Sequence, residues 1–383
     1  MRKIKVGIVC YPTFGGSGVV ATELGKALAK IGHEVHFITY SQPSRLDFLN
    51  ENLFYHEVDF RSYPLFEYPP YELALASKMV GVVRDEKLDL LHVHYAIPHA
   101  SAAYMAKQIL KTHGIQIPVV TTLHGTDITL VGRDVSYEPV VTFSINQSDG
   151  VTAVSEDLRK ETYAFFNITN QIEVIPNFID LEKFRKQKRD HFRQVICPSG
   201  EALIVHTSNF REVKRIPDVI HVFEKILKSI PAKLLLIGDG PERSPAEKLC
   251  RQLGIESEVR FLGKMEAVED VLSVADLFLM PSEKESFGLA ALEAMACEVP
   301  VVSTNTGGIP EVNIDGQTGF LCEVGDVDTM AEKSLQILQP DQLPHFRSRA
   351  LQRARDFDIS VILPKYEALY FKVLDKIKTT PLN

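Results

Sequence analysis

Short apolar runs alternate with helical patterns along this chain, and the alternation occurs twice. In the first half the apolar runs are KIKVGIVCY, HEVHFITY, DLLHVHYA, PVVTTLHG and GVTAVS. In the second half they are ALIVHTS, KLLLIGDG, EVRFLG, ADLFLMPS and VPVVSTN. Runs of this length separated by helical stretches are typical of parallel strands buried under helices on both faces. The sequence therefore predicts an α/β protein with two Rossmann-like, doubly wound sheets in tandem.

The length of 383 residues suits two domains, each large enough to bury its own core. We place them at residues 1–170 and 171–360, and we expect the C-terminal helical segment 361–383 to join the first domain. The polar and basic segment 181–200 has no clear periodicity, so we interpret it as the interdomain connection, with its charges facing solvent. Two lobes imply a cleft between them.

The composition limits the kinds of partner that the chain can bind and the compartment in which we expect it. A formal charge of −8 argues against broad binding of nucleic acid or of anionic membranes, which need basic surfaces. The five cysteines are odd in number and widely spaced, which is typical of reduced thiols in the cytoplasm. The apolar part of the N-terminus is too short for a secretion signal, and no apolar run reaches the length of a membrane span. Self-association is left open.

A glycine-rich turn follows the first apolar run. Gly15, Gly16, Ser17 and Gly18 precede a helical pattern, where free backbone N–H groups and the helix dipole favour an anion. The order of the glycines is not that of a dinucleotide fingerprint, and the second run ends without the acidic residue that would hold a ribose. A turn that only tightens the packing between strand and helix is the alternative.

The segment SNFREVKR supplies cations at a second position. Arg211, Lys214 and Arg215 follow a strand pattern, and open parallel sheets bind ligands at the carboxyl ends of their strands. These residues are candidates for a diphosphate clamp, although a solvated basic loop would show the same pattern. The glycines of LLLIGDGPE, after the next run, give only a weak signal of their own.

Two carboxylates flank the start of a predicted helix in ESFGLAALEAMA. Glu285 precedes Gly288, and Glu293 lies inside the helix. This arrangement fits a nucleotide-sugar, with the phosphates at the helix start and the carboxylates accepting from hydroxyl groups. An amphipathic helix with incidental glutamates is the alternative.

Together these segments resemble the retaining glycosyltransferases of family 4, which have the GT-B fold. The resemblance rests on PSEKESFGLAALEAMACEVPVVSTNTGGIPEV, LLLIGDGPE, VRFLGK, VIPNFID and the early glycine turn. More narrowly, YPTFGGSGVVATELG, HVHYAIPHA, TTLHGTDITLVG and SNFREVKR resemble a subgroup that begins bacillithiol synthesis. That subgroup transfers N-acetylglucosamine from UDP-N-acetylglucosamine to L-malate. The resemblance implies that residues 1–170 bind the acceptor and that residues 171–360 bind the nucleotide-sugar.

The resemblance also implies roles for individual residues. The group implied in catalysis is Lys214, His124 and Glu285, and we add Arg211 because it lies close to Lys214 in the sequence. The group implied in donor binding is Gly16, Asn209, Arg260, Leu262, Phe287, Gly288, Leu289 and Glu293. The candidates for the malate pocket are Ser17, Tyr95, Thr126 and Asn146. Asn209 departs from the family pattern, because many members carry an arginine there, five residues before the clamp lysine.

The implied reaction needs no metal and no cofactor. Charge that develops on the β-phosphate would be stabilised by Arg211, Lys214 and the helix dipole. Two D-x-D patterns, at 326–328 and 356–358, precede helical segments and suit helix caps better than a metal. The alternatives are a family 4 transferase with another small or lipid acceptor, a UDP-sugar 2-epimerase, and a two-lobed binding protein without catalysis.

Overall fold

A computed structural model describes residues 2–13, 15–46, 50–59, 69–132, 134–187 and 189–378. Within these ranges the chain forms two compact units, Met1–Asn177 with Ile359–Asn383, and Phe178–Asp358. The unit boundaries lie at 177/178 and 358/359, compared with 170/171 and 360/361 in the sequence interpretation. Residues 379–383 of the expected C-terminal helix lie outside the described residues.

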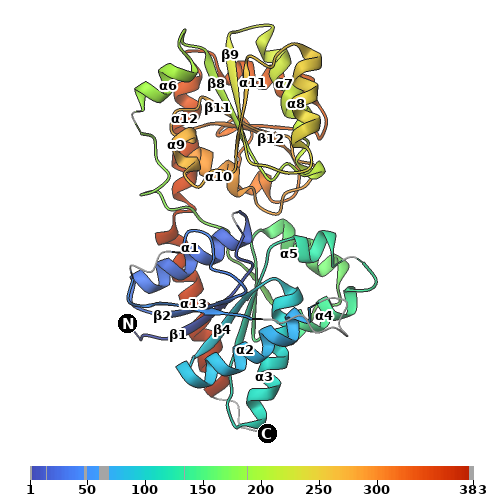
Figure 1. Ribbon diagram of the computed structural model, residues 1–383, viewed down its shortest axis with the longest axis vertical. Coiled ribbons are helices and arrows are strands. Elements are labelled where there is room, and N and C mark those ends of the chain that lie inside the picture. Colours follow the sequence, from blue (N-terminus) through green and yellow to red (C-terminus); the bar gives the residue numbers. More distant parts are fainter. Residues whose placement is uncertain are drawn as a thin grey trace. The chain divides into compact units, whose positions relative to one another are not determined.

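The first unit is built on a parallel sheet of seven strands (Figure 1). Its strands are β1 (Lys5–Val9), β2 (Glu34–Thr39), β3 (Leu53–Glu57), β4 (Leu90–His94), β5 (Val119–Leu123), β6 (Gly150–Ala153) and β7 (Ile172–Val174). Its helices are α1 (Ser17–Lys30), α2 (Tyr71–Glu86), α3 (Ser101–Thr112), α4 (Glu138–Asn146), α5 (Glu156–Phe165) and α13 (Ile359–Lys378). Short helical turns occupy Ala96–Ala100 and Thr126–Leu130.

The strand order in this unit is β3-β2-β1-β4-β5-β6-β7. Gly7 of β1 lies opposite His36 of β2 on one side and Leu91 of β4 on the other. The order reverses between β1 and β4, so the loops that leave these two strands diverge there. Such a switch point is where open α/β sheets bind ligands.

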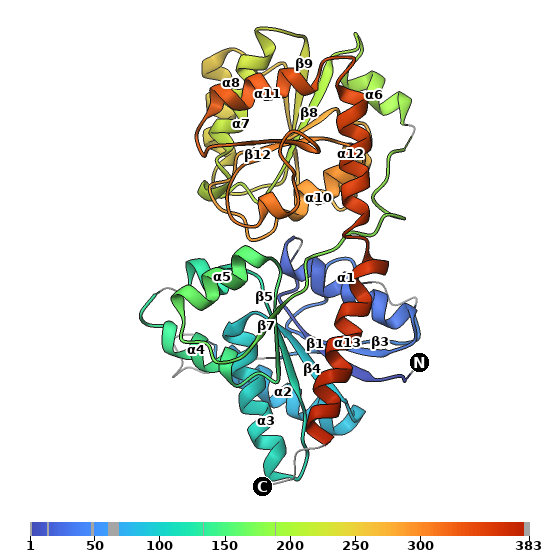
Figure 2. The same cartoon turned by 180° about the vertical axis from the view of Figure 1, so that it is seen from behind.

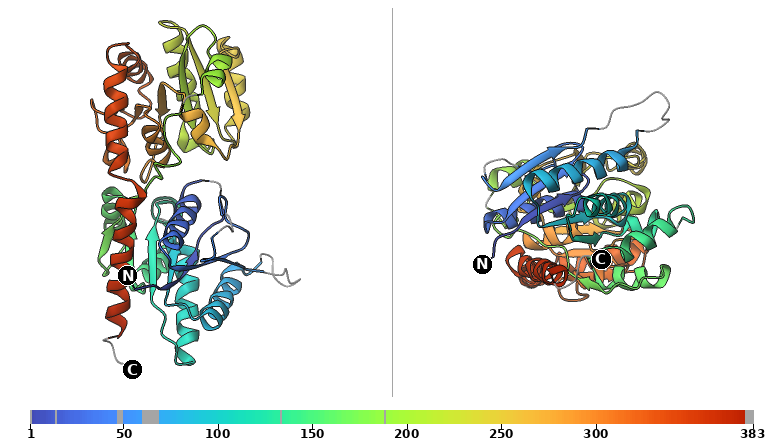
Figure 3. Two further views of the ribbon diagram at one scale, coloured as in Figure 1. Left: turned by 90° about the vertical axis from the view of Figure 1, so that its left-hand side faces the viewer. Right: turned by 90° about the horizontal axis from the view of Figure 1, so that it is seen from below.

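Helices cover both faces of the first sheet, and Figure 3 shows α13 and α2 on opposite sides of it. On the α2 side, Leu75 and Met79 pack with Ile38 and Leu91 in one buried cluster. On the other side, Tyr370 of α13 bonds through its hydroxyl group to His92 Nδ1 of β4, at 2.7 Å. The last helix of the chain is therefore part of the N-terminal core (Figure 2).

The second unit holds a parallel sheet of six strands in the order β10-β9-β8-β11-β12-β13. Its strands are β8 (Ala202–Thr207), β9 (Ala232–Ile237), β10 (Val259–Gly263), β11 (Leu277–Met280), β12 (Val301–Thr304) and β13 (Gly319–Cys322). Its helices are α6 (Asp190–Ile196), α7 (Ile216–Leu227), α8 (Arg243–Leu253), α9 (Val268–Leu272), α10 (Leu289–Ala296), α11 (Val327–Ile337) and α12 (Leu343–Arg355). Here the switch point lies between β8 and β11.

Strands β11 and β12 are buried at every position and β8 and β9 at most positions, as their apolar sequences predict. Leu234 and Leu236 of β9 join Val219 and Phe223 of α7 in a core cluster with nearly no exposed surface. The predicted architecture of two doubly wound parallel sheets is confirmed.

Four elements were not predicted from the sequence. Strands β3, β7 and β13 lie at sheet edges, and their short sequences carry weak patterns. Helix α6 lies inside segment 181–200, which belongs to the second unit and is not a free connection. The expectation that the charges of this segment only face solvent is wrong, because Arg193 of α6 forms an ion pair with Asp276 at 2.6 Å.

None of the helices in the described ranges combines the length and the apolar character needed to cross a bilayer. All five cysteines are buried and free, in line with the expectation of reduced thiols.

Candidate functional site

At the switch point of the C-terminal sheet, one loop leaves β8 and another leaves β11. The β8 loop carries Lys214 and the β11 loop carries Glu285, and the lysine Nζ lies 2.5 Å from the carboxylate Oε1. Their side chains are only 19% and 16% exposed. A backbone hydrogen bond from Glu283 N to Val213 O, at 2.8 Å, fixes the two loops side by side. The sheet topology therefore joins two residues that are far apart in the sequence.

Glu285 is held from several directions. Ser282 Oγ donates to its Oε1 at 2.9 Å, and its backbone carbonyl accepts from Gly308 N at 2.9 Å. A Cβ on Gly307 would lie 2.0 Å from that same carbonyl oxygen. The glycine pair after β12 is thus required by the close approach of two backbones, and it sets the position of the Glu285 loop.

Helix α10 begins directly after this loop. Its N-cap is Gly288 with a φ of 94°, and no side chain caps the helix and no acidic residue lies in its first turn. The first N–H groups of α10, which include that of Leu289, are thus left for an anion. Phe287 is buried against Phe357, and Glu293 is 8% exposed.

The other cations of the β8 loop behave differently from Lys214. Arg215 Nε donates to Asp218 at 2.6 Å, which commits Arg215 to a local pair. Arg211 and Asn209 are exposed. Within the described part of the chain, Arg211 has no ion pair, so its guanidinium is free to reach a ligand.

The β9 and β10 loops border the same edge. A Cβ on Gly238 would lie 1.7 Å from Ser208 O, and a Cβ on Gly240 would lie 2.1 Å from Asn209 O. These two glycines therefore let the turn after β9 pack on the loop after β8. Arg260 and Leu262 lie on the edge strand β10. The register shifts at Leu262, which is an extra residue between two paired ones, as in a β-bulge. Its backbone groups are therefore outside the regular ladder.

The N-terminal sheet has its own group of side chains at the β1/β4 switch point. Gly16 is the N-cap of α1 with a φ of 58°, and a Cβ there would meet open space. Gly18 differs, because its Cβ would lie 2.5 Å from Tyr11 O. The glycine turn therefore has two functions: Gly18 permits tight packing, and Gly16 leaves the helix start open.

Ser17 and Tyr95 meet above this switch point. Ser17 Oγ donates to the Tyr95 hydroxyl oxygen at 2.8 Å. Tyr95 directly follows β4 and has a φ of 86°, a strained conformation for a residue with a side chain. The Tyr95 ring lies 5.2 Å from that of His124 and 5.6 Å from that of Tyr11.

His124 follows β5 and is hydrogen-bonded to a second histidine. Its Nε2 lies 2.8 Å from Nδ1 of His94, the last residue of β4. Burial lowers the pKa of His124 to about 3 and lowers the pKa of His94 well below its usual range. Both rings are therefore neutral near pH 7. The bond occupies Nε2 of His124, so its Nδ1 is the ring nitrogen that can meet a substrate.

Asp127 holds the β4 and β5 loops together. Its carboxylate accepts from the backbone N–H groups of Ala96, Gly125 and His124 at 2.8, 3.0 and 3.3 Å. Burial raises the pKa of Asp127 to about 6, and the three N–H donors oppose that rise. Asp127 thus fixes the backbone of His124. Thr126 beside it is exposed.

Asn146 is not part of this group. It is the last residue of α4, which leads into the amino end of β6. Asn146 therefore lies at the amino ends of the strands, whereas the other candidates lie at the carboxyl ends. Its side-chain amide accepts from Thr169 N at 2.8 Å and donates to Asn167 O at 2.9 Å. Its expected role in an acceptor pocket is therefore not supported, because a helix pattern alone does not show which end reaches the ligand edge.

Sequence reasoning missed several residues around both sites. Tyr11, His94, Asp127 and Ser282 were not among the candidates. HVHY and HGTD contain two of these residues, and the placement of polar residues directly after strand patterns was the signal that could have identified them.

The two D-x-D patterns have different outcomes. Asp326 caps α11 by accepting from Thr329 N at 3.0 Å, which confirms the prediction of a cap. Asp356 instead follows the end of α12 and pairs with Arg353 at 2.8 Å, and Asp358 accepts from Leu181 N at 3.4 Å. The second pattern therefore links two helices. Asp358 directly precedes α13, in the predicted cap position, whereas Asp356 follows the end of α12.

Comparison with known proteins gives consistent results for both units. Residues 14–183 match the family model described as Glycosyltransferase Family 4, and residues 187–356 match that described as Glycosyl transferases group 1. The chain is 49% identical over 378 residues to the N-acetyl-alpha-D-glucosaminyl L-malate synthase of Bacillus anthracis, covering 97% of this chain and 98% of that protein.

Solved structures share the fold at low sequence identity. A glycosyltransferase from Rickettsia africae has a TM-score of 0.80 at 20% identity, covering 98% of this chain and 99% of its own. The Anabaena protein HepE, solved in complex with UDP and glucose, has a TM-score of 0.79 at 19% identity, covering 98% and 100%. At such identities the likeness shows the two-domain fold alone.

Proposed function

The chain belongs to glycosyltransferase family 4, and on this premise we propose that it transfers N-acetylglucosamine from UDP-N-acetylglucosamine to the hydroxyl group of L-malate. The observation that carries the choice of substrates is the 49% identity, over nearly the whole length, to a synthase whose name states this product. The configuration at the anomeric carbon would be retained. The product would enter bacillithiol synthesis, as the subgroup resemblance implies.

The donor is assigned to the carboxyl edge of the C-terminal sheet. The diphosphate would meet the open start of α10 at Gly288 and Leu289, with Lys214 and Arg211 beside it. Glu293 would accept from the ribose hydroxyl groups. The backbone of Leu262 lies outside the regular ladder of β10, and its N–H and C=O groups would suit the edge of a base that needs both a donor and an acceptor.

The remaining donor residues have supporting roles in this proposal. Arg260 would present its backbone to the base, and Phe287 would shape the loop before α10. Asn209 stands where many family members carry an arginine, and its exposed side chain would face the diphosphate with Arg211.

The Lys214–Glu285 pair suggests how binding proceeds. Lys214 and Glu285 form an ion pair in which the lysine neutralises the carboxylate. When the donor binds, the β-phosphate would take over the lysine, and Glu285 would turn to the hydroxyl groups of the sugar. Each charged group thus exchanges one polar partner for another, which limits the cost of desolvation.

The acceptor is assigned to the N-terminal unit. The malate carboxylates would bind at the start of α1, where Gly16 leaves the helix N–H groups open. Tyr95 and Thr126 would donate from their hydroxyl groups, and Ser17 would hold the Tyr95 hydroxyl group in place. The first turn of α1 contains no acidic residue, so an anion meets no opposing carboxylate there.

The chemistry is the exchange of one C–O bond for another. The bond between the anomeric carbon and the β-phosphate oxygen breaks, and the malate hydroxyl oxygen forms the new bond to that carbon. The hydroxyl proton passes to the departing phosphate oxygen. Lys214, Arg211 and the α10 dipole would stabilise the charge on that phosphate. His124, neutral at pH 7, would act as a hydrogen-bond partner of the donor sugar and not as an acid.

Product identity is the direct test. The purified chain, incubated with UDP-N-acetylglucosamine and L-malate, is expected to give a glycoside of malate by mass spectrometry and an α-anomer by NMR. UDP release with a panel of other hydroxy acids, inositol phosphate and lipid acceptors tests the alternative acceptors. Conversion of the donor to its C2 epimer without malate would instead support the epimerase.

Two further assays test the mechanism. Lys214→Ala is expected to lower kcat about 100-fold or more, with a smaller change in donor affinity, because the lysine acts on charge that develops during the reaction. We also expect EDTA to leave the transfer rate unchanged. Loss of activity with EDTA and recovery with Mn²⁺ would contradict a metal-free mechanism.

A further inference from the structure

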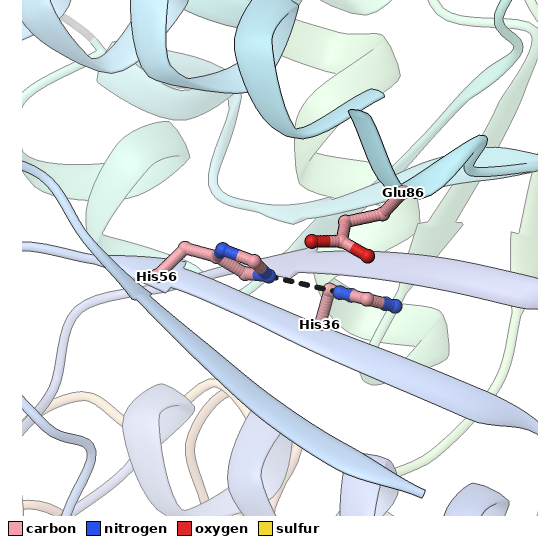
Figure 4. Close-up of side chains that lie close together, drawn as sticks. All are labelled: His36, His56 and Glu86. Atoms are coloured by element: carbon pink, nitrogen blue, oxygen red, sulfur yellow. Dashed lines mark hydrogen bonds between the residues drawn. The ribbon is translucent and has the colours of Figure 1, made fainter. Parts of the chain in front are cut away.

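Two histidines and a glutamate gather on the N-terminal unit, away from the residues discussed so far. His36 comes from β2, His56 from the edge strand β3, and Glu86 is the last residue of α2 (Figure 4). One ligand atom from each side chain lies within 4.8 Å of the other two. His36 is buried, and the other two are partly exposed.

This cluster is separate from the proposed acceptor residues. In the order β3-β2-β1-β4, the histidine-bearing strands lie on the far side of β1 from β4. His36 shares its side of β2 with Ile38, which packs in the α2 cluster. No role in sugar transfer accounts for two histidines and a carboxylate at this place.

The surroundings of His36 are those of a metal ligand. Its Nε2 lies 2.9 Å from Glu34 Oε1, and Lys5 Nζ lies 2.5 Å from the same oxygen. A carboxylate beside one ring nitrogen holds the proton there, so that the other nitrogen presents its lone pair. That other nitrogen, Nδ1, points to His56 Nε2 at 2.9 Å.

A neutral histidine pair accounts for only part of this arrangement. The two rings stack, with centroids 5.1 Å apart and an interplanar angle of 18°, and Phe54 stacks on His36 at 4.8 Å. Neither the ring stacking nor the hydrogen bond between the rings involves Glu86, although a carboxylate oxygen of Glu86 lies within 4.8 Å of a nitrogen of each ring. A cation is the partner that would satisfy both nitrogens and the carboxylate at once.

We propose that His36 Nδ1, His56 Nε2 and Glu86 bind one divalent transition-metal cation. Two imidazoles, one carboxylate and a water molecule form a ligand set that suits Zn²⁺ in tetrahedral geometry. Such ligands lie about 3.3 Å apart, since each is about 2.0–2.1 Å from the metal. The histidine nitrogens therefore separate slightly and the Glu86 carboxylate moves closer, which requires side-chain rotation only.

Metal binding requires only a change in which ring nitrogen of His56 carries the proton, and no change in the fold. His36 already holds its proton on Nε2 toward Glu34, whereas His56 must move its proton from Nε2 to Nδ1 before it binds the metal. The bound cation joins β2, the edge strand β3 and the end of α2. Its effect is therefore on the stability of this edge and not on sugar transfer.

The test uses the full chain without a histidine tag, freed of metal by a chelator. Calorimetric titration with ZnCl₂ is expected to show one equivalent bound, and Co²⁺ is expected to give the visible absorption of a tetrahedral site. His56→Asn and Glu86→Gln should remove this binding, and Glu34→Gln should weaken it by about 10–100-fold. His113→Asn, which changes an exposed histidine at the end of α3, is the matched control and should bind as the parent does.

Thermal melts separate binding from folding. All variants are expected to melt near the parent temperature without metal. With ZnCl₂, the parent and His113→Asn should gain stability, Glu34→Gln should gain less, and His56→Asn and Glu86→Gln should gain none. Equal zinc binding by His56→Asn, Glu86→Gln and the parent would overturn the proposal, and so would the absence of binding to the parent. UDP release is expected to be the same with and without bound zinc.

Discussion

Replacement of Glu285 by Gln should have opposite effects on UDP binding and on sugar transfer. Glu285 holds Lys214 at 2.5 Å, and both side chains are less than one-fifth exposed. Bound UDP competes with Glu285 for the lysine, and its phosphates are repelled by the carboxylate. Glu285→Gln removes both effects, so UDP should bind more tightly to the variant.

The magnitude follows from the burial of the pair. Exposed ion pairs contribute about 0.2–1 kcal/mol, and loss of one partner from a fully buried pair costs about 3–5 kcal/mol. For this partly buried pair we expect a gain of about 1–2 kcal/mol in UDP binding, or roughly 5–30-fold in Kd. Turnover should fall, because Gln cannot accept as strongly from the sugar hydroxyl groups.

The assay is calorimetric titration with UDP at two salt concentrations, together with UDP release from UDP-N-acetylglucosamine and malate. Glu283→Gln is the matched control, because it removes the same charge from an exposed position in the same loop. Its effect should be small and strongly reduced by salt. Weaker UDP binding by Glu285→Gln, or an equal gain for Glu283→Gln, would refute the exchange of partners at Lys214.

Three further predictions concern the N-terminal unit. Gly18→Ala should destabilise the fold and lower activity, since the new Cβ would lie 2.5 Å from Tyr11 O. Gly15→Ala should be tolerated, because a Cβ there would meet no atom of the described part of the chain within 4 Å. Urea unfolding compares the two variants. Asp127→Asn should cost about 1–3 kcal/mol, because its NH₂ group would face a backbone N–H. Burial raises the pKa of Asp127 from 3.8 to about 6, so the folded chain binds this proton more tightly than the unfolded chain does. The proton therefore stabilises the fold at low pH by about 3 kcal/mol, and this contribution is lost as the pH rises through 6. Asp127→Asn should lack that pH dependence when unfolding is measured from about pH 4 to 7. Burial lowers the pKa of His92 to about 3, so below pH 6.5 the unfolded chain binds more protons and the free energy of unfolding falls as the pH falls. His92→Gln should reduce the slope of unfolding free energy against pH by up to about 1.4 kcal/mol per pH unit. An unchanged slope would contradict the neutral buried ring.

Local sequence patterns predicted the elements that build the two sheets. Most strands were visible as apolar runs, because a strand covered on both faces needs apolar side chains at successive positions. The starts of α1 and α10 were visible as glycine turns. The edge strands β3, β7 and β13 were not, since an edge strand is shielded less and its sequence is less distinctive.

The candidate site was only partly predictable. Lys214 and Glu285 were both candidates, but their pairing depends on the adjacency of β8 and β11, which no local pattern states. Asn146 was misplaced for the same reason. The bond between His94 and His124 likewise depends on the adjacency of β4 and β5.

The sequence by itself determined the fold class, the family and the residue types at the two helix starts, because each depends on neighbours within a few positions. Tertiary structure decided which of these residues meet. Strand order brings together Lys214 and Glu285, and also His36, His56 and Glu86, from separate parts of the chain. These contacts arise because the packing of the whole sheet sets the order of its strands, and this order decides which polar residues on the strands and on the loops that follow them become neighbours.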